Sequence, residues 1–154
     1  MKFIKTALVA LSLIFMTNLA SQAETIAYAN FKKIESEYTY AKTSYKEIDN
    51  KVLELQQYVI DKDKQFKAID SPIQKKNFEE KIQKEYKAKE DEVLKLKLQK
   101  EDEIYKNIMN ATKAVAAAKN IDVVLDYRVI FTGGVDISND VIQYLNANTA
   151  QPKK

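Results

Sequence analysis

The chain has 154 residues, which suits a single domain, and its formal net charge is +3. It contains no cysteine and no histidine, which excludes disulfides, zinc fingers, the usual haem ligands and His-dependent nucleophilic sites. Its two glycines, Gly133 and Gly134, are adjacent, so the sequence has neither a P-loop nor a dinucleotide-binding fingerprint. We therefore expect no enzyme, no metal and no cofactor. The many Lys, Glu, Gln, Ala and Leu residues favour long helices.

Residues 1–23 have the pattern of a secretory signal peptide. Lys2 and Lys5 precede an apolar run, Ala7–Ala20, and small residues precede a cleavage point after Ala23. A membrane anchor is the alternative, but the run of about 14 residues is shorter than the roughly 20 needed to span a bilayer. We expect export to the periplasm. Loss of Lys2 and Lys5 lowers the net charge from +3 to +1.

Residues 35–119 have the pattern of two long helices. A heptad seam begins at Ile34 and continues to Ile69 with only Lys62 breaking its apolar character, which predicts a coiled coil rather than a helix on a globular core. Ser71 as N-cap before Pro72 predicts that one helix ends and another begins at residues 70–72. Such a short joint predicts an antiparallel helical hairpin whose second helix reaches about residue 119.

The two ends of the chain have β-strand patterns. We predict strands over residues 25–30, 121–126 and 128–132, the last two joined by a tight turn and ended by Gly133 and Gly134. Ser138 is predicted to cap a short helix over residues 139–146, followed by a disordered tail at 148–154. The expected fold class is α+β, mostly α. A long antiparallel helical hairpin forms a coiled-coil arm that projects from a small β body made of residues 24–34 and 120–147.

A body of this size buries too little apolar surface to be stable alone, so the chain is expected to self-associate through it. The physics predicts an oligomer without fixing its number. The side chains assigned to this oligomerisation surface or to the body core are Ile26, Tyr28, Val123, Val124, Leu125 and Ile130.

The order of these segments resembles the Skp/OmpH family of periplasmic chaperones. Residues 26–30 (IAYAN) resemble that family's first strand and residues 121–126 (IDVVLD) its second, while residues 135–138 (VDIS) resemble the entry to its terminal helix. The resemblance implies a homotrimer whose arms enclose a cavity. It also implies an ATP-independent holdase for unfolded outer-membrane proteins in the periplasm.

Aromatic and basic side chains on the arm are the candidate binding residues. Tyrosine suits contact with unfolded chains because it combines an apolar ring with a polar edge, although rings at helical spacing can equally pack the hairpin itself. The candidate client-binding rings are Tyr40, Tyr58, Phe66, Phe78, Tyr86 and Tyr105. Lysines near the arm tip could steer acidic clients or approach anionic lipid or lipopolysaccharide head groups, or simply solvate the helices: Lys62, Lys64, Lys67, Lys75, Lys76, Lys81 and Lys84.

A structural or adaptor protein is the second hypothesis. A periplasmic coiled coil that bridges envelope components would have the same composition, but it would dock one folded partner at its tip. No nucleic-acid partner is expected, because the predicted exported chain is nearly neutral and contains a single arginine, Arg128.

Overall fold

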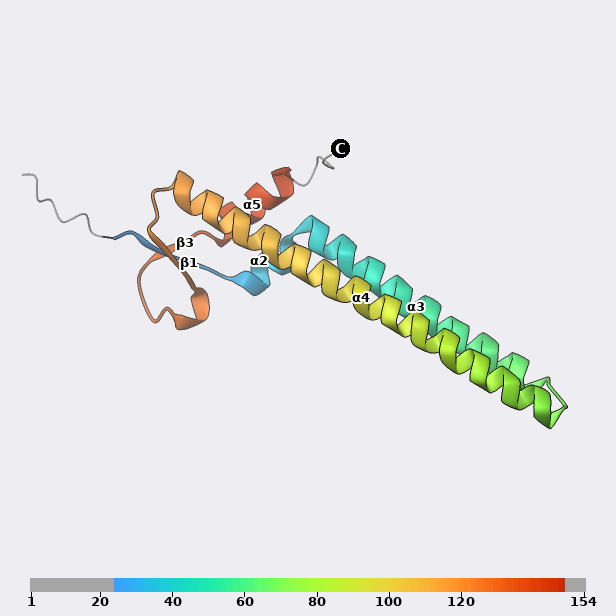
Figure 1. Ribbon diagram of the computed structural model, residues 1–154. Helices are drawn as coiled ribbons and strands as arrows, with labels where there is room; N and C mark the ends of the chain where they lie inside the picture. Colours follow the sequence, from blue (N-terminus) through green and yellow to red (C-terminus); the bar gives the residue numbers. More distant parts are fainter. Residues whose placement is uncertain (1–23, 149–154) are drawn as a thin grey trace, which may run out of the picture.

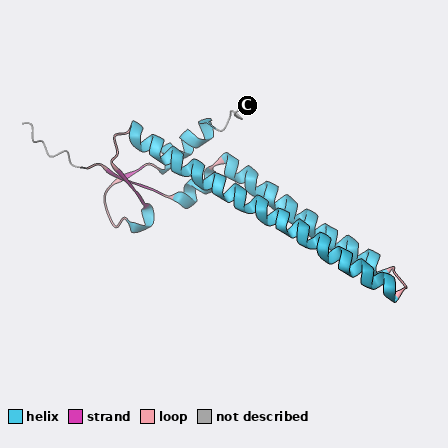
Figure 2. Cartoon of the chain, in the orientation of Figure 1, coloured by secondary structure: helices cyan, strands magenta, loops and turns pink. Residues whose placement is uncertain are grey.

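The computed structural model describes residues 24–148, so the expected signal peptide and residues 149–154 of the expected tail lie outside the described part. The fold is α+β and mostly helical (Figure 2). The elements in chain order are β1 (Ile26–Ala29), α2 (Phe31–Glu37), α3 (Thr39–Lys67), α4 (Pro72–Ala118), β2 (Val123–Asp126), the 3-10 helix η2 (Tyr127–Val129), β3 (Val135–Asp136) and α5 (Ser138–Asn148).

The two long helices, α3 and α4, lie side by side and project away from the sheet (Figure 1). We call α3 and residues 72–103 of α4 the arm, and the remaining elements the body. The predicted start of the second helix is confirmed: Ser71 accepts a hydrogen bond from the backbone N–H of Gln74, and Pro72 occupies the first turn. Both residues act locally, since the N-cap accepts from an otherwise unpaired N–H and proline needs no hydrogen bond there.

The prediction of one unbroken helix along the heptad seam is wrong at Tyr38. This residue has an extended backbone (φ −73°, ψ 117°) and separates α2 from α3. Its side chain is buried in the body core, while the chain on either side stays helical. Burial along the seam also fades with distance from the body: Ile34 and Ile48 are buried, whereas Val52 and Val59 are exposed.

The sheet has three strands in the order β2-β1-β3, and both pairings are parallel. Ile26 is opposite Val123 and Tyr28 is opposite Leu125, so these four side chains share one face of the sheet. The chain ends do meet in one sheet, but the predicted hairpin of residues 121–126 and 128–132 is wrong.

Asp126 explains why that hairpin does not form. Its carboxylate accepts hydrogen bonds from the backbone N–H of Arg128 and from its guanidinium, at 2.9 and 2.8 Å, and this turn leads into η2 instead of a strand. The Arg128 bond also lowers the pKa of Asp126. Gly133 and Gly134 then take positive φ angles of 81° and 84°, which redirect the chain so that β3 pairs parallel with β1.

The C-terminal helix α5 begins at Ser138, and the prediction that Ser138 is its cap is wrong. The Ser138 hydroxyl instead donates to Asp136 at 2.6 Å and accepts from the backbone N–H of Asn30 at 2.9 Å. Asp136 also accepts from the Ser138 N–H, and these bonds lower the pKa of its carboxyl. The helix also runs to Asn148, two residues beyond the predicted end, so Asn148 is helical rather than part of the tail.

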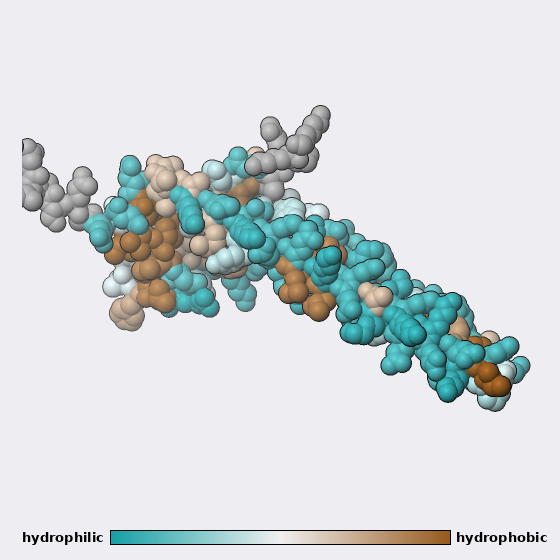
Figure 3. All heavy atoms as spheres, viewed as in Figure 1, coloured by the Kyte–Doolittle hydropathy of each residue, from teal (hydrophilic) through white to brown (hydrophobic). Residues whose placement is uncertain are grey.

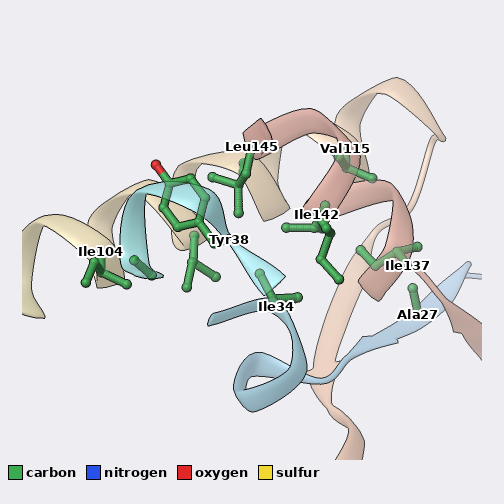
Figure 4. Packing of buried hydrophobic residues seen from close by; sticks show 12 residues of the cluster. Ala27, Ile34, Tyr38, Ile104, Val115, Ile137, Ile142 and Leu145 are labelled. Carbon is green, nitrogen blue, oxygen red and sulfur yellow. The ribbon is translucent and has the colours of Figure 1, made fainter. Parts of the chain in front are cut away.

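The hydrophobic core lies in the body, where side chains of α2, α4 and α5 meet Ala27 of β1 (Figure 4). Each large aliphatic side chain buried here contributes about 1.5–3 kcal/mol of transfer free energy. The core therefore fixes the base of the arm and leaves the arm itself with little interior. Its buried members are Ala27, Ile34, Tyr38, Ala41, Ile104, Ile108, Ala111, Val115, Ile137, Val141, Ile142 and Leu145.

Candidate functional site

Hydrogen bonds between tyrosines and carboxylates connect the two helices of the arm. Tyr58 on α3 donates to Glu85 on α4 at 2.6 Å, and Tyr40 donates to Glu103. Burial and the Glu85 bond raise the pKa of Tyr58 to about 12, and the same bond lowers the pKa of Glu85. The Tyr40 bond likewise lowers the pKa of Glu103. These two rings therefore hold α3 against α4.

Tilted aromatic rings and neighbouring lysines join the helices near the tip. Phe66 on α3 and Phe78 on α4 have ring centroids 6.4 Å apart. The Lys75 ammonium lies 5.4 Å from the Phe66 centroid, and that of Lys62 lies 5.3 Å from Tyr58 and 6.0 Å from Phe78. A groove of about 460 Å³ opens beside these rings, and Tyr86 lies on its lining. We call it the tip groove; Val59, Lys62, Asp63, Phe66, Phe78, Glu79, Ile82, Gln83 and Tyr86 line it.

The six aromatic side chains expected to bind clients do not form one exposed surface. Tyr40, Tyr58, Phe66 and Phe78 make contacts between α3 and α4, as the alternative interpretation stated. Tyr86 is exposed at the tip groove. Tyr105 is exposed over 54% of its surface, and its ring centroid lies 5.9 Å from that of Phe31.

Several exposed apolar side chains on the arm were missed by the sequence analysis. Leu53 is 60% exposed and Ile60 is 50% exposed, seven residues apart on α3, while Leu94 and Leu98 are 53% and 58% exposed one turn apart on α4. We call these four side chains the arm stripe residues. Leu53 and Ile60 fall outside the 4-3 seam of the first helix, and that position was the signal that could have found them, whereas no 4-3 seam extends to Leu94 and Leu98.

The lysines near the tip are of two kinds. Lys67 pairs with Asp63 at 2.6 Å and Lys64 with Asp61 at 3.8 Å, each on its own helix. Lys81 pairs with Glu85 in the same way, at 3.8 Å. Lys76 and Lys84 form no ion pair among residues 24–148, so their charges remain available to a partner. Exposed pairs of this kind add little to stability, so all these lysines can exchange partners readily.

The sheet leaves one face uncovered in the single chain. Ile26, Val123 and Leu125 are exposed on it, and Tyr28 is half-buried on the same face. Val124 points to the opposite face and packs against the body core, which separates it from the other expected oligomerisation residues. Hydrophobic residues gather at this end of the molecule in Figure 3. We call Ile26, Tyr28, Val123 and Leu125 the sheet face.

The connection between β2 and β3 extends this apolar surface. Ile130, another expected oligomerisation residue, is half-buried there, whereas Val129 is exposed and Phe131 is fully exposed. An open cavity of about 500 Å³ lies between β2, α2 and α4, and Phe31, Met109, Ala116, Ile121 and Val124 contribute to its lining. We call it the body groove.

Within residues 24–148, no group of three or more acidic side chains is placed to hold a metal ion. None of the helices in this part of the chain is both long and apolar enough to span a membrane. Comparison of the sequence with protein-family models gives no match, and comparison with curated proteins gives none either.

Proposed function

We propose that this protein is an ATP-independent holdase chaperone of the periplasm. In this proposal the chain, cleaved after Ala23, forms a homotrimer through its body, and three arms enclose an unfolded outer-membrane protein. The resemblance to the Skp/OmpH family suggested this function. The observation that carries it is the exposure of the apolar side chains Leu53, Ile60, Leu94 and Leu98 on an arm that is rich in lysine.

We propose that the arm is an antiparallel coiled-coil hairpin. Three contacts support this arrangement, because the partner's number on α4 falls as the number on α3 rises: Tyr40 with Glu103, Tyr58 with Glu85, and Phe66 with Phe78. Lys100 adds a fourth contact at the base of the arm, 3.1 Å from Glu47, and that hydrogen bond raises the pKa of Lys100.

The surface of the arm suits weak contact with many unfolded chains. Leu53 and Ile60 line a shallow groove together with Asn50, Glu54, Gln56 and Gln57, so charged and amide side chains interrupt this apolar surface. Unfolded β-barrel strands expose apolar side chains without a fixed shape. Scattered aliphatic contacts with flexible lysines around them can hold such chains without requiring one binding geometry.

Self-association through the body is supported by the state of the sheet. Parallel sheets are normally covered on both faces, but here Ile26, Val123 and Leu125 are exposed on one face. Both outer strands, β2 and β3, also have a free edge within the described residues, and a free edge invites pairing with another chain. Contact between the sheet faces of neighbouring subunits would cover this apolar surface.

Light scattering on residues 24–154, alone and with a urea-unfolded outer-membrane β-barrel, tests the proposal. We expect a mass of three chains that gains one client and keeps it in solution. The control is the same β-barrel already folded in detergent micelles, which should not bind. A dimer, or a trimer that leaves the client to aggregate, would overturn the proposal.

The tip groove favours a second candidate function, a coiled-coil adaptor between envelope components. A groove of about 460 Å³ lined by Phe66 and Phe78, with Lys62, Asp63 and Glu79 also in its lining, could dock one folded partner. Substitution Phe78→Ser would abolish binding by such an adaptor. It would leave a holdase active, because the arm stripe residues remain.

A further inference from the structure

The junction of α2 and α3 is a break in one helix beside a continuous neighbour. Helix α2 ends at Glu37, α3 begins at Thr39, and only Tyr38 lies between them. Helix α4 passes this level without interruption over its 47 residues. We call the segment from Glu37 to Thr39 the joint. It lies at the base of the arm, where the arm leaves the body (Figure 1).

One side chain from α5 binds both helix ends at the joint. The Asn146 side-chain oxygen accepts a hydrogen bond from the backbone N–H of Thr39 at 2.9 Å. Its amide nitrogen donates to the backbone carbonyl of Glu37 at 3.2 Å. Helix ends leave such N–H and C=O groups without intrahelical partners, and Tyr38, the N-cap of α3, makes no side-chain capping bond there. Asn146 therefore caps α2 and α3 together.

Other contacts bring the surrounding helices to the same level. The Asn107 amide on α4 lies 3.3 Å from the Tyr38 hydroxyl, to which it donates. Helix α5 is seated on the body by buried Ile142 and Leu145. Lys119, just after α4, lies 3.0 Å from Asp140 on α5. The packing of α5 on the body thus sets the position of Asn146. The hydrogen bond from Thr39 to Asn146 connects the body to the first residue of the arm.

We propose that Asn146 is a positioning residue that fixes the direction of the arm relative to the body. To bend a pair of helices, both must deform, but at the joint only α4 is continuous. The two Asn146 hydrogen bonds bridge the gap in the other helix and restore the stiffness of the pair. The importance of this for holding a client rests on the proposed function; the mechanical role of Asn146 does not.

The absence of cysteine allows the direction of the arm to be measured directly. Spin labels at Asn110→Cys on the body end of α4 and Lys64→Cys on the arm report one intrachain distance by pulsed electron resonance. Labelled chains are diluted with unlabelled chains so that distances between subunits do not contribute. Both sites are exposed, and neither belongs to the sheet face.

Three variants separate positioning from general stabilisation. Asn146→Ala removes both hydrogen bonds, and Asn146→Asp keeps the acceptor for Thr39 but loses the donor to Glu37. Asn148→Ala is the matched control, because the Asn148 amide donates within α5 to the Tyr144 carbonyl at 2.7 Å, and no other Asn148 side-chain bond occurs among residues 24–148. We expect Asn146→Ala to broaden the distance distribution and to speed amide exchange at Thr39 about tenfold, the effect of one lost hydrogen bond. Asn146→Asp should keep Thr39 protected and broaden the distribution less.

An unchanged distance distribution in both Asn146 variants would overturn the proposal, even if their unfolding midpoints fall. That result would mean that Asn146 only stabilises α5. If Asn146→Ala does not fold, Asn146→Asp alone tests whether Asn146 fixes the direction of the arm. Amide exchange at Thr39 and the distance distribution are independent measurements on that variant. No client is present in these measurements. The Asn146 variants could loosen the arm while the unsubstituted chain fails to hold a client in the light-scattering test. That combination would refute the proposed function and leave the role of Asn146 supported.

Discussion

The phenol of Tyr45 on α3 donates a 2.6 Å hydrogen bond to the carboxylate of Glu35 on α2, so these two side chains connect the helices across the joint. Burial, and then this bond to Glu35, raise the pKa of Tyr45 to about 12 from its ordinary value of 10.0. No periodic pattern predicts this hydrogen bond between a tyrosine and a carboxylate, because it joins residues of two helices that the sequence pattern presents as one helix.

This pair predicts a loss of stability at alkaline pH. The folded protein keeps the Tyr45 proton to about pH 12, whereas the unfolded chain releases it near pH 10. The stabilisation is fully present below pH 10 and is lost as the pH rises through 12. Tyr58 behaves in the same way, because its pKa is also about 12. Absorbance at 295 nm should show tyrosines that titrate late, and Tyr45→Phe and Tyr58→Phe should each remove one of them. A titration with all tyrosines near pH 10 would contradict the prediction.

We expect that substitution of Ser44 by alanine stabilises the protein. Ser44 is buried on α3, and its hydroxyl has no hydrogen-bond partner within the described residues. A buried polar group without a partner is destabilising, so Ser44→Ala should raise the free energy of unfolding by ~1 kcal/mol. Thermal unfolding should show a Tm higher by roughly 2–4 °C.

The control for this prediction is Ser36→Ala. The Ser36 hydroxyl is exposed and donates to the Lys33 carbonyl at 2.9 Å. Both variants gain the same helix propensity from alanine, so the difference between them compares a buried hydroxyl that lacks a partner with an exposed hydroxyl that is hydrogen-bonded. Equal Tm changes would mean that burial of the Ser44 hydroxyl has no net cost.

Substitution by aspartate should have different consequences at Val123 and at Val124, two neighbouring residues of β2. Val123 lies on the exposed sheet face, and Val124 packs against the core of its own chain. Val123→Asp should therefore weaken self-association without disturbing the core of its own chain. Val124→Asp should destabilise the chain itself by about 2 kcal/mol or more, because it brings an unpaired charge toward the core. Sedimentation velocity and thermal unfolding separate the two effects. A stable oligomer of the Val123→Asp variant would mean that the sheet face is not the association surface.

The long helices and their capped tip were predictable because the signals are local. The heptad seam, Ser71 and Pro72 each act within one or two turns. The interruption at Tyr38 was not predictable in the same way, since no proline or glycine marks it. The bonds that hold it come from Asn146, 107 and 109 residues away in the sequence. A residue so distant has no periodic relation to the joint.

The errors in the body and at the site also have physical causes. Residues 128–132 have a β-strand composition, but the Asp126–Arg128 pair turns the chain first, and β3 is too short to produce a pattern. On the arm, the spacing of aromatic residues located the rings. It could not show that Glu85 and Glu103 lie across from Tyr58 and Tyr40 and bind their hydroxyls.

Salt dependence of client capture is predicted to depend on the unpaired lysines. Lys76 and Lys84 have no carboxylate partner in the described chain, whereas the charges of Lys67 and Lys87 are offset by Asp63 and by Asp91 at 3.4 Å. Stopped-flow association with an acidic unfolded client should slow clearly between low and physiological salt. The double substitution Lys76→Gln with Lys84→Gln should slow it more than the same change at Lys67 and Lys87. Rates independent of salt would exclude steering.

The arm stripe residues predict where clients bind. Leu94→Ser with Leu98→Ser removes two exposed apolar side chains from α4, so the affinity for unfolded clients should fall several-fold while thermal stability changes little. Tyr58→Phe is the matched control, because it disrupts a contact between α3 and α4 without changing the exposed surface. Fluorescence anisotropy of a labelled client, with Tm measured in parallel, distinguishes the two variants. If the Tyr58 variant loses affinity and the Leu94 and Leu98 variant does not, client binding depends on the contact between α3 and α4 and not on the arm stripe residues.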